Sequence, residues 1–121
     1  MVDELLDVNC EEAQASFTVR SDNFFLDREG RLEASGLIEH IAQSASAFAG
    51  YMALLAGATE PPMGYIGEVK NFSCCRRPRT GDELRTTIRL GPEAGGVMLL
   101  SGETRVGEKI VADTQMKIFL Q

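Results

Sequence analysis

The sequence predicts one α+β domain in which a single long helix is surrounded by an antiparallel sheet of five or six strands. Three observations predict this fold. An uninterrupted helical repeat of apolar residues runs from about Leu32 to Gly57. Most of the remaining chain alternates apolar and polar residues, as strands with one buried face do. The later alternating stretches are joined by links of hairpin length, which favours antiparallel neighbours over parallel units.

The length and the charge of the chain limit what it can be. At 121 residues it has the size of one domain, so residues 1–121 are expected to share a single core. The net charge of −6 and the lack of a long basic run argue against nucleic acid as a partner. The first residues are acidic where a secretory signal is basic, and no apolar run approaches the roughly 20 residues that cross a bilayer. A cytoplasmic protein that binds no membrane is expected.

The sequence gives no sign of a metal or a cofactor. Cys10, Cys74 and Cys75 form no CxxC pair, so neither a zinc site nor a disulfide framework is suggested. No nucleophile elbow, phosphate-binding glycine loop or dinucleotide fingerprint occurs. Any chemistry is therefore expected to depend on ordinary side chains and backbone amides.

The expected helix is preceded by a strand at Ala15–Val19 and a possible short strand around Phe24–Leu26. Within Leu32–Gly57 the apolar residues recur at three- and four-residue steps, and Gly57 supplies a stop. The second face of this helix carries small residues in place of Lys and Glu, which predicts burial nearly all round. These small residues are Ser44, Ser46, Ala47, Ala49, Gly50 and Ala53.

Three longer strands are expected in the second half of the chain. They cover Leu84–Leu90, Val97–Val106 and Lys109–Leu120. Pro92–Gly96 is expected to be a flexible turn, and Gly107-Glu108 a tight turn between the last two strands.

Glu39 is the conspicuous acid of the helix, because its neighbours are apolar or small. Gln43, Ser46 and Gly50 lie roughly on its face and form a narrow polar strip with it. Burial without a cationic partner disfavours the charged carboxylate, so Glu39 is a candidate proton donor. The alternative is a structural Glu that favours the helix dipole and reaches water at a dimer seam.

His40 is the only histidine and follows Glu39 directly. Consecutive helix residues diverge by about 100°, so the two side chains cannot converge on one substrate within one subunit. We expect His40 to be packed in the core or exposed on the surface, unless a second subunit brings it to another site.

Arg76, Arg77 and Arg79 are the only concentrated positive charge on this acidic chain. A solvated strand end would explain them. Because guanidinium groups suit phosphate, they are also a candidate docking point for a phosphopantetheine arm or an acidic carrier protein.

Two segments resemble a known family. Glu39-His40-Ile41-Ala42-Gln43 is similar to a helix motif, and the stretch from Gly64 to Phe72 is similar to a tunnel-lining strand. Arg77-Pro78 and the turn Gly81–Leu84 follow in the family's order. The family is the FabA/FabZ class of hotdog-fold 3-hydroxyacyl-carrier-protein dehydratases, and the sequence resembles most the dehydratase-like subunits of aryl-polyene pathways.

The resemblance implies a hotdog fold and an acyl thioester carried by acyl-carrier protein or coenzyme A. In such enzymes a His removes the proton beside the thioester carbonyl, and a helix carboxyl group helps to expel water. Glu39 matches that carboxyl group, and the amides of Ala34 and Ser35 match the pair that polarises the carbonyl. The resemblance also implies further substrate-binding residues, which are Gln43 on the helix and Tyr65 and Gly67 on the tunnel-lining strand.

One departure from the family's pattern concerns its catalytic His. That residue precedes the acid by fourteen positions, where this chain has Phe25. Three hypotheses remain open. In the first, the chain is a dehydratase-like enzyme that uses Glu39 with another group, such as Asn23 or water. In the second, it is a hotdog thioesterase in which one carboxylate activates water. In the third, it is a complementary subunit beside a His-bearing hotdog protein.

A small open sheet has two edges that must be paired or shielded. We therefore expect a homodimer, or a hotdog heterodimer under the third hypothesis, with the sheets joined edge to edge.

Overall fold

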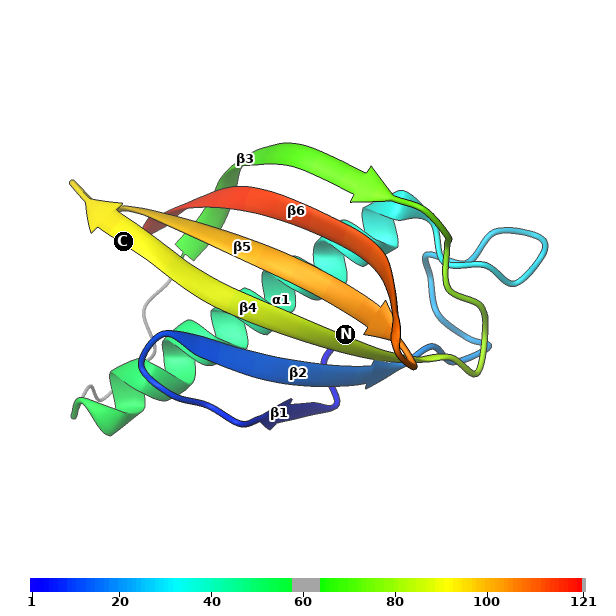
Figure 1. Ribbon diagram of the computed structural model, residues 1–121, viewed down its shortest axis with the longest axis horizontal. Helices are drawn as coiled ribbons and strands as arrows, with labels where there is room; N and C mark the ends of the chain where they lie inside the picture. Colours follow the sequence, from blue (N-terminus) through cyan, green and yellow to red (C-terminus); the bar gives the residue numbers. More distant parts are fainter. Residues whose placement is uncertain (58–63, 121) are drawn as a thin grey trace.

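One helix lies across the inner face of a curved six-stranded sheet in the computed structural model of the chain (Figure 1). The structure describes residues 1–57 and 64–120, with the main chain alone for 64–67 and 120. Its elements are β1 (Glu4–Leu6), β2 (Glu12–Thr18), α1 (Ala34–Leu55), β3 (Gly64–Cys74), β4 (Glu83–Ala94), β5 (Val97–Val106) and β6 (Lys109–Leu120). The strand order is β1-β2-β4-β5-β6-β3, and each neighbouring pair is antiparallel. The α+β fold predicted from the sequence is confirmed.

The helix and the last two strands lie where the sequence predicted them. Helix α1 is shorter than the predicted range by two residues at each end. Strands β5 and β6 have the predicted bounds, and Gly107 turns between them with a positive φ of 62°. Strand β2 begins three residues earlier than predicted, and β3 continues two residues past Phe72.

Two predictions about local structure were wrong. The segment Phe24–Leu26 is not a strand: it is a turn in which Asn23 accepts the backbone N–H of Phe25 through its side-chain oxygen, at 2.9 Å. The predicted turn Pro92–Gly96 is largely strand, because β4 extends to Ala94. Pro92 is tolerated there because the register of β4 on β5 shifts between Leu90 and Glu93, so no ladder bond is lost.

The core lies between the sheet and one face of α1. Leu37, Ile41 and Phe48 are fully buried on the helix, and they face the inward residues of the strands. The closest approach is at Gly102 on β5, where an added Cβ would lie only 2.5 Å from Cγ2 of Ile41. A residue without a side chain is required at this position for the helix to pack on the sheet.

The opposite face of α1 is open, which corrects the prediction that the helix is buried nearly all round. The small side chains of Ala47, Ala49, Gly50 and Ala53 are half-buried, and Ser46 is exposed. Near the end of the helix the large apolar side chains of Tyr51, Leu54 and Leu55 are also exposed. The sheet therefore covers one side of the helix and leaves a strip of small residues that no strand among the described residues covers.

The two edges of the sheet differ in length. On one side β1 is a strand of three residues, and on the other β3 is a strand of eleven residues whose one partner strand in the described part of the chain is β6. Asn71 interrupts the β3 ladder in a left-handed conformation (φ 52°), where the register shifts between Lys70 and Ser73. Its side-chain amide donates to Gln115 on β6 at 3.1 Å, which holds the irregular segment against its neighbour.

Candidate functional site

Glu39 lies in the second turn of α1, half-buried on the open side of the helix. The side-chain amide of Gln43, one turn further on, donates to Oε1 of Glu39 at 2.7 Å. No other hydrogen bond to this carboxylate comes from the described part of the chain. The backbone nitrogen of Met1 donates in turn to Oε1 of Gln43. The polar strip predicted from helical spacing therefore includes a hydrogen-bonded pair, and the amino terminus lies beside it.

His40 points the other way, into the core. Its side chain is 0% exposed, and its ring stacks on that of Phe17 with the centroids 5.7 Å apart. Nδ1 lies 2.8 Å from the carbonyl oxygen of Met1, and Nε2 lies 2.7 Å from the hydroxyl oxygen of Thr86. Burial lowers the pKa of His40 and favours a neutral ring. Of the alternatives left open by the sequence, the packed histidine is the one found, and it does not converge with Glu39.

Phe25 occupies the position where the family's pattern has its catalytic His. Its side chain packs on the first turn of α1, where a Cβ added to Gly36 would lie 2.6 Å from Cβ of Phe25. Gly36 precedes Glu39 by one helical turn, so Phe25 covers the same end of the helix as the carboxylate. An aromatic ring there cannot accept a proton. Asn23, the other candidate of this loop, uses its side-chain oxygen to fix the turn.

The start of α1 offers two backbone donors. Glu33 precedes the helix in an extended conformation, and its side chain makes no capping hydrogen bond. Its carbonyl oxygen accepts the N–H groups of Gly36 and Leu37. Among the described residues, no acceptor faces the N–H groups of Ala34 and Ser35. Such open amides at a helix start can polarise a carbonyl oxygen.

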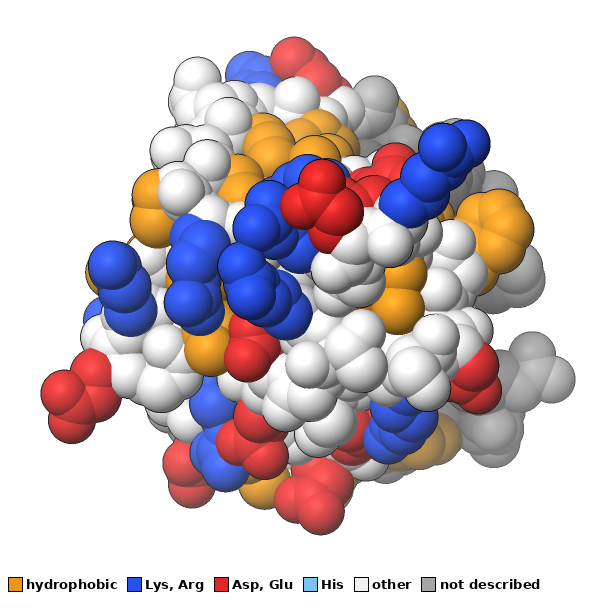
Figure 2. All heavy atoms as spheres, turned by 90° about the vertical axis from the view of Figure 1, so that its right-hand side faces the viewer, with side chains coloured by type: hydrophobic (Ala, Val, Ile, Leu, Met, Phe, Trp, Pro, Cys, Tyr) orange, Lys and Arg blue, Asp and Glu red, His pale blue; other side chains and the backbone are white. Residues whose placement is uncertain are grey.

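A basic hollow of about 590 Å³ adjoins the same end of the helix. Figure 2 shows this end of the molecule, with Lys and Arg side chains gathered on it. The hollow is lined by Arg31, Ala34, Cys74, Cys75, Arg76, Arg77 and Arg79. Arg77 pairs with Asp27 at 3.0 Å, and Arg76 approaches Asp82 at 3.9 Å. The structure thus places Ala34, Arg76 and Arg77, which the sequence selected separately, around one hollow.

Arg31 belongs to this hollow although the sequence did not single it out. It precedes the helix, 45 positions before Arg76. A bridge between the backbones of Arg31 and Arg79 joins the two segments. The contact between two loops distant in sequence could not be anticipated from local composition.

Tyr65 and Gly67 lie on β3, where the resemblance implied a tunnel-lining strand. The main chain of Tyr65 pairs with Phe119 on β6. The Tyr65 side chain, and any contact that Gly67 makes with a substrate, lie outside the described residues.

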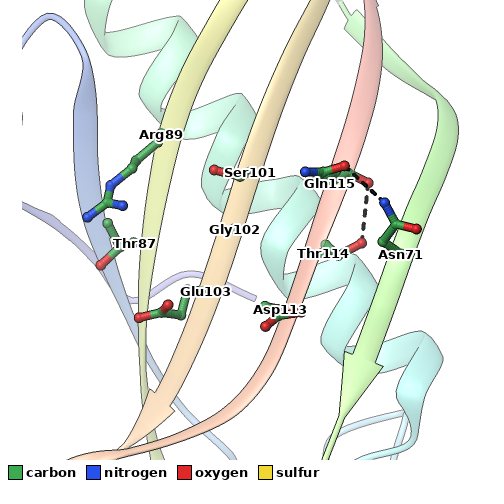
Figure 3. Close-up of a pocket in the computed structure, with 9 residues that line it drawn as sticks. All are labelled: Asn71, Thr87, Arg89, Ser101, Gly102, Glu103, Asp113, Thr114 and Gln115. Carbon is green, nitrogen blue, oxygen red and sulfur yellow. Dashed lines mark hydrogen bonds between the residues drawn. The ribbon is translucent and has the colours of Figure 1, made fainter.

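A second hollow, of about 290 Å³, lies on the outer face of the sheet (Figure 3). In Figure 3 the labelled residues of this hollow lie on β3, β4, β5 and β6, and α1 passes behind the sheet. Arg89 there is paired with Glu12 at 2.9 Å, and Gln115 is bonded to Asn71. Because the sheet separates this surface from Glu39, the outer hollow is not part of the candidate site.

A long helix held in a curved antiparallel sheet is the arrangement of the hotdog class of proteins. Residues 1–121 match the ApeP-like family, described as ApeP dehydratase, and the chain belongs to that family. No curated protein matches the sequence. Within the described residues, no helix combines the length and the apolar character that a bilayer span requires.

Solved structures with the same fold include one named as the dehydratase heterocomplex ApeI:P from Xenorhabdus doucetiae. It superposes with a TM-score of 0.90 at 16% identity, over 99% of this chain and 82% of that one. A hypothetical thioesterase from Streptococcus pneumoniae, solved with coenzyme A, gives a TM-score of 0.78 at 11% identity, over 98% and 87%. The Escherichia coli PaaI protein gives 0.76 at 13%, over 98% and 78%. At these identities the likeness shows the fold alone.

Proposed function

We propose that this chain is the carboxylate-bearing subunit of a dehydratase heterodimer acting on 3-hydroxyacyl thioesters, in which a second hotdog subunit supplies the base. The observation that carries the proposal is at Phe25. The position of the family's His holds an aromatic ring, and the chain's single imidazole, at His40, is buried with both nitrogens occupied. Glu39 therefore has no basic partner within the described part of its own chain, and the likeness to a structure named as a heterocomplex supports a partner.

The proposed division of labour balances the reaction. A base from the partner removes the proton from the carbon beside the thioester carbonyl. The carbon–oxygen bond of the 3-hydroxyl group breaks as Glu39 delivers a proton to the departing oxygen, which leaves as water. The electron pair of the broken C–H bond becomes the second bond of the new double bond. The amides of Ala34 and Ser35 would stabilise the negative charge that develops on the carbonyl oxygen.

Two surfaces support association with a partner. Strand β3 ends the sheet with eleven residues whose outer edge has no partner strand among the described residues, and an open edge readily accepts another strand. The small-residue face of α1 is open on the same molecule, and small side chains allow another element to approach closely. Ser35, Glu39, Ser46 and Gly50 lie along this face, so a subunit that covers it would also close the site around Glu39.

The arginine-lined hollow is the proposed binding site of the phosphate on the pantetheine arm. It touches Ala34, so a phosphate held there would leave the arm beside the helix start, where the thioester is expected. Guanidinium groups bind phosphate oxygens through paired hydrogen bonds. An acidic carrier protein would meet here the one basic surface that the sequence provides.

Complementation tests the division of labour. The purified chain, the His-bearing hotdog protein and their mixture would be assayed for water loss from a 3-hydroxyacyl carrier thioester and for hydrolysis of an unhydroxylated acyl thioester. The proposal expects dehydration from the mixture and at least 100-fold less from this chain alone. Full dehydration by this chain alone contradicts it, and hydrolysis of the unhydroxylated thioester by this chain would favour a thioesterase.

Charge reversal tests the docking surface. Arg76→Glu with Arg77→Glu should weaken binding of an acyl-carrier protein at low salt at least tenfold and reduce the salt dependence of what remains. Arg85→Glu with Arg105→Glu is the matched control, because these side chains are exposed, lie opposite each other on the outer face and also pair with acidic residues. Equal losses in the two double variants, or none in the first, would place the carrier elsewhere.

A further inference from the structure

His40 has no part in the proposed dehydration, yet both of its ring nitrogens are hydrogen-bonded in a fully buried environment. A carbonyl oxygen can only accept, so Nδ1 carries the proton and donates to Met1. In the neutral ring Nε2 is then an acceptor, and the hydroxyl group of Thr86 donates a hydrogen bond to it. The oxygen of Thr86, 2.7 Å from that of Thr104, accepts from the second hydroxyl. The protein thus selects one tautomer of His40.

Met1 connects the two sides of the helix. Its carbonyl oxygen accepts from His40 on the buried side, and its backbone nitrogen donates to Gln43 on the open side. This donor decides which way the Gln43 amide is turned, because the amide oxygen must face Met1. The amide nitrogen then faces Glu39 and holds Oε1 at 2.7 Å. The second oxygen of Glu39 is the one left for proton transfer.

The segment that carries Met1 is fastened to the sheet. Strand β1 pairs with β2, and the Asp3 N–H donates to the Ser16 carbonyl at 2.7 Å. The Asp3 carboxylate accepts the N–H of Thr18 at 2.8 Å and pairs with Arg20 at 2.7 Å. We call residues 1–6 the strap. Its sheet contacts fix its direction, and the bond to His40 fixes its end over the helix.

We propose that His40 is a positioning residue which, through Met1 and Gln43, sets the orientation of the Glu39 carboxylate, and that the strap is therefore part of the site. The proposal deepens the proposed function, since it rests on the role of Glu39 in proton transfer. His40 would thus influence Glu39, the residue before it in the helix, without contacting its side chain.

Two substitutions test the hydrogen bonds of the two ring nitrogens of His40 separately. An Asn side chain places an amide donor near the position of Nδ1, and a Gln side chain places its amide near the position of Nε2. His40→Asn should keep the bond to Met1 and lose the bond to Thr86, whereas His40→Gln should do the reverse. In the complex with the partner, we expect His40→Gln to lower kcat about tenfold with KM within about twofold, and His40→Asn to keep kcat within about threefold.

Nuclear magnetic resonance on this chain gives a readout that requires no catalysis. The side-chain NH₂ signals of Gln43 and the chemical shift of the Glu39 carboxyl carbon should change in His40→Gln and stay near those of the parent in His40→Asn. Equal responses in the two variants, or no response of Gln43 in His40→Gln, would overturn the positioning role. If these signals respond as expected while the complex shows no dehydration, the positioning role stands and the proposed function fails.

The unaltered protein provides a test that does not depend on the folding of a variant. Nitrogen-15 spectra should show His40 neutral at pH 7, with the proton on Nδ1. A proton on Nε2 would turn the lone pair of Nδ1 toward the Met1 carbonyl oxygen. That outcome would remove the link between His40 and the strap and overturn the proposal.

Discussion

The two faces of helix α1 differ in burial and in how far their polar groups are hydrogen-bonded. On the sheet side, the large apolar side chains of the helix are fully buried, and the buried His40 has a partner at each nitrogen. On the open side, they are small or polar, and Glu39 keeps one oxygen without a hydrogen-bond donor among the described residues. Within the described residues, one face is fully packed and the other is partly open.

This difference shows where stability and function lie. The position of the helix is fixed by close packing against Gly102 in the sheet and against Phe25 in the preceding loop. The open side does not contribute to that packing, so its residues can change without loss of the fold. Substitutions on the two faces should therefore affect different properties, and the following predictions test that separation.

The largest effect is expected on the open face, at the carboxylate. Glu39→Gln keeps the shape and the bond to Gln43 but removes the acidic proton of the carboxyl group, so dehydration by the complex should fall by about 100-fold or more, or about 2.7 kcal/mol. The free energy of unfolding should stay within about 0.5 kcal/mol. Glu11→Gln, at an exposed position, is the control. Unchanged turnover in Glu39→Gln would reduce Glu39 to a structural residue.

On the sheet face, the prediction concerns stability. Gly102→Val would place methyl groups where Ile41 already lies, and the overpacking should cost about 2 kcal/mol in urea denaturation. Ser101→Val, the neighbouring position on the outer face, is expected to change stability by less than about 0.5 kcal/mol. A Gly102→Val protein as stable as the parent would show that the helix can move away from β5.

A smaller effect is expected from the part of the open face that is far from Glu39. Ala53 lies on the same side of the helix, about 21 Å along its axis. Ala53→Arg should leave the stability of the single chain unchanged but weaken its association with the partner about tenfold, or about 1.4 kcal/mol. Titration calorimetry would measure it against Ala94→Arg, at an exposed strand end. Equal affinities would mean that this part of the helix remains open in the complex.

The smallest effect is expected on the pH dependence of stability, through His40 on the sheet face. Burial holds the pKa of His40 below its ordinary value of 6.5, so the unfolded chain binds a proton that the native chain does not. Stability should therefore fall as the pH decreases below 6.5, and His40→Asn should remove that slope. The Arg20 side chain lowers the pKa of Asp3 from 3.8, and that contribution is lost only at more acidic pH. Denaturation between pH 7 and about 5 isolates the histidine.

Periodic segments were predictable because their patterns are local. The helix and strands β5 and β6 each carry an apolar repeat of the right period. Strand β1 has no such pattern in three residues and forms because β2 offers it an edge. The extension of β4 through Pro92 was missed because a proline normally ends a strand, and its tolerance depends on a bulge set by β5.

For the site, the sequence could indicate residue types but not their partners. Glu39 and Gln43 were placed together correctly because four residues separate them on a helix. The contact of Met1 with His40 and Gln43 spans about 40 positions, and no local pattern encodes it. The same holds for Arg31 beside Arg76 in the hollow, which only the folded loops bring together.

The long open edge of β3 also bears on how the protein must be produced. A chain released without the proposed partner exposes the outward-facing N–H and C=O groups of this edge, which has no second partner strand among the described residues, and such an edge can pair with another extended segment, including a second copy of itself. Synthesis in excess of the partner would therefore lead to aggregation instead of a reserve of free subunits. Under the proposed function, balanced expression of the two subunits should therefore limit aggregation, and preparations made together should be more soluble than preparations mixed afterwards.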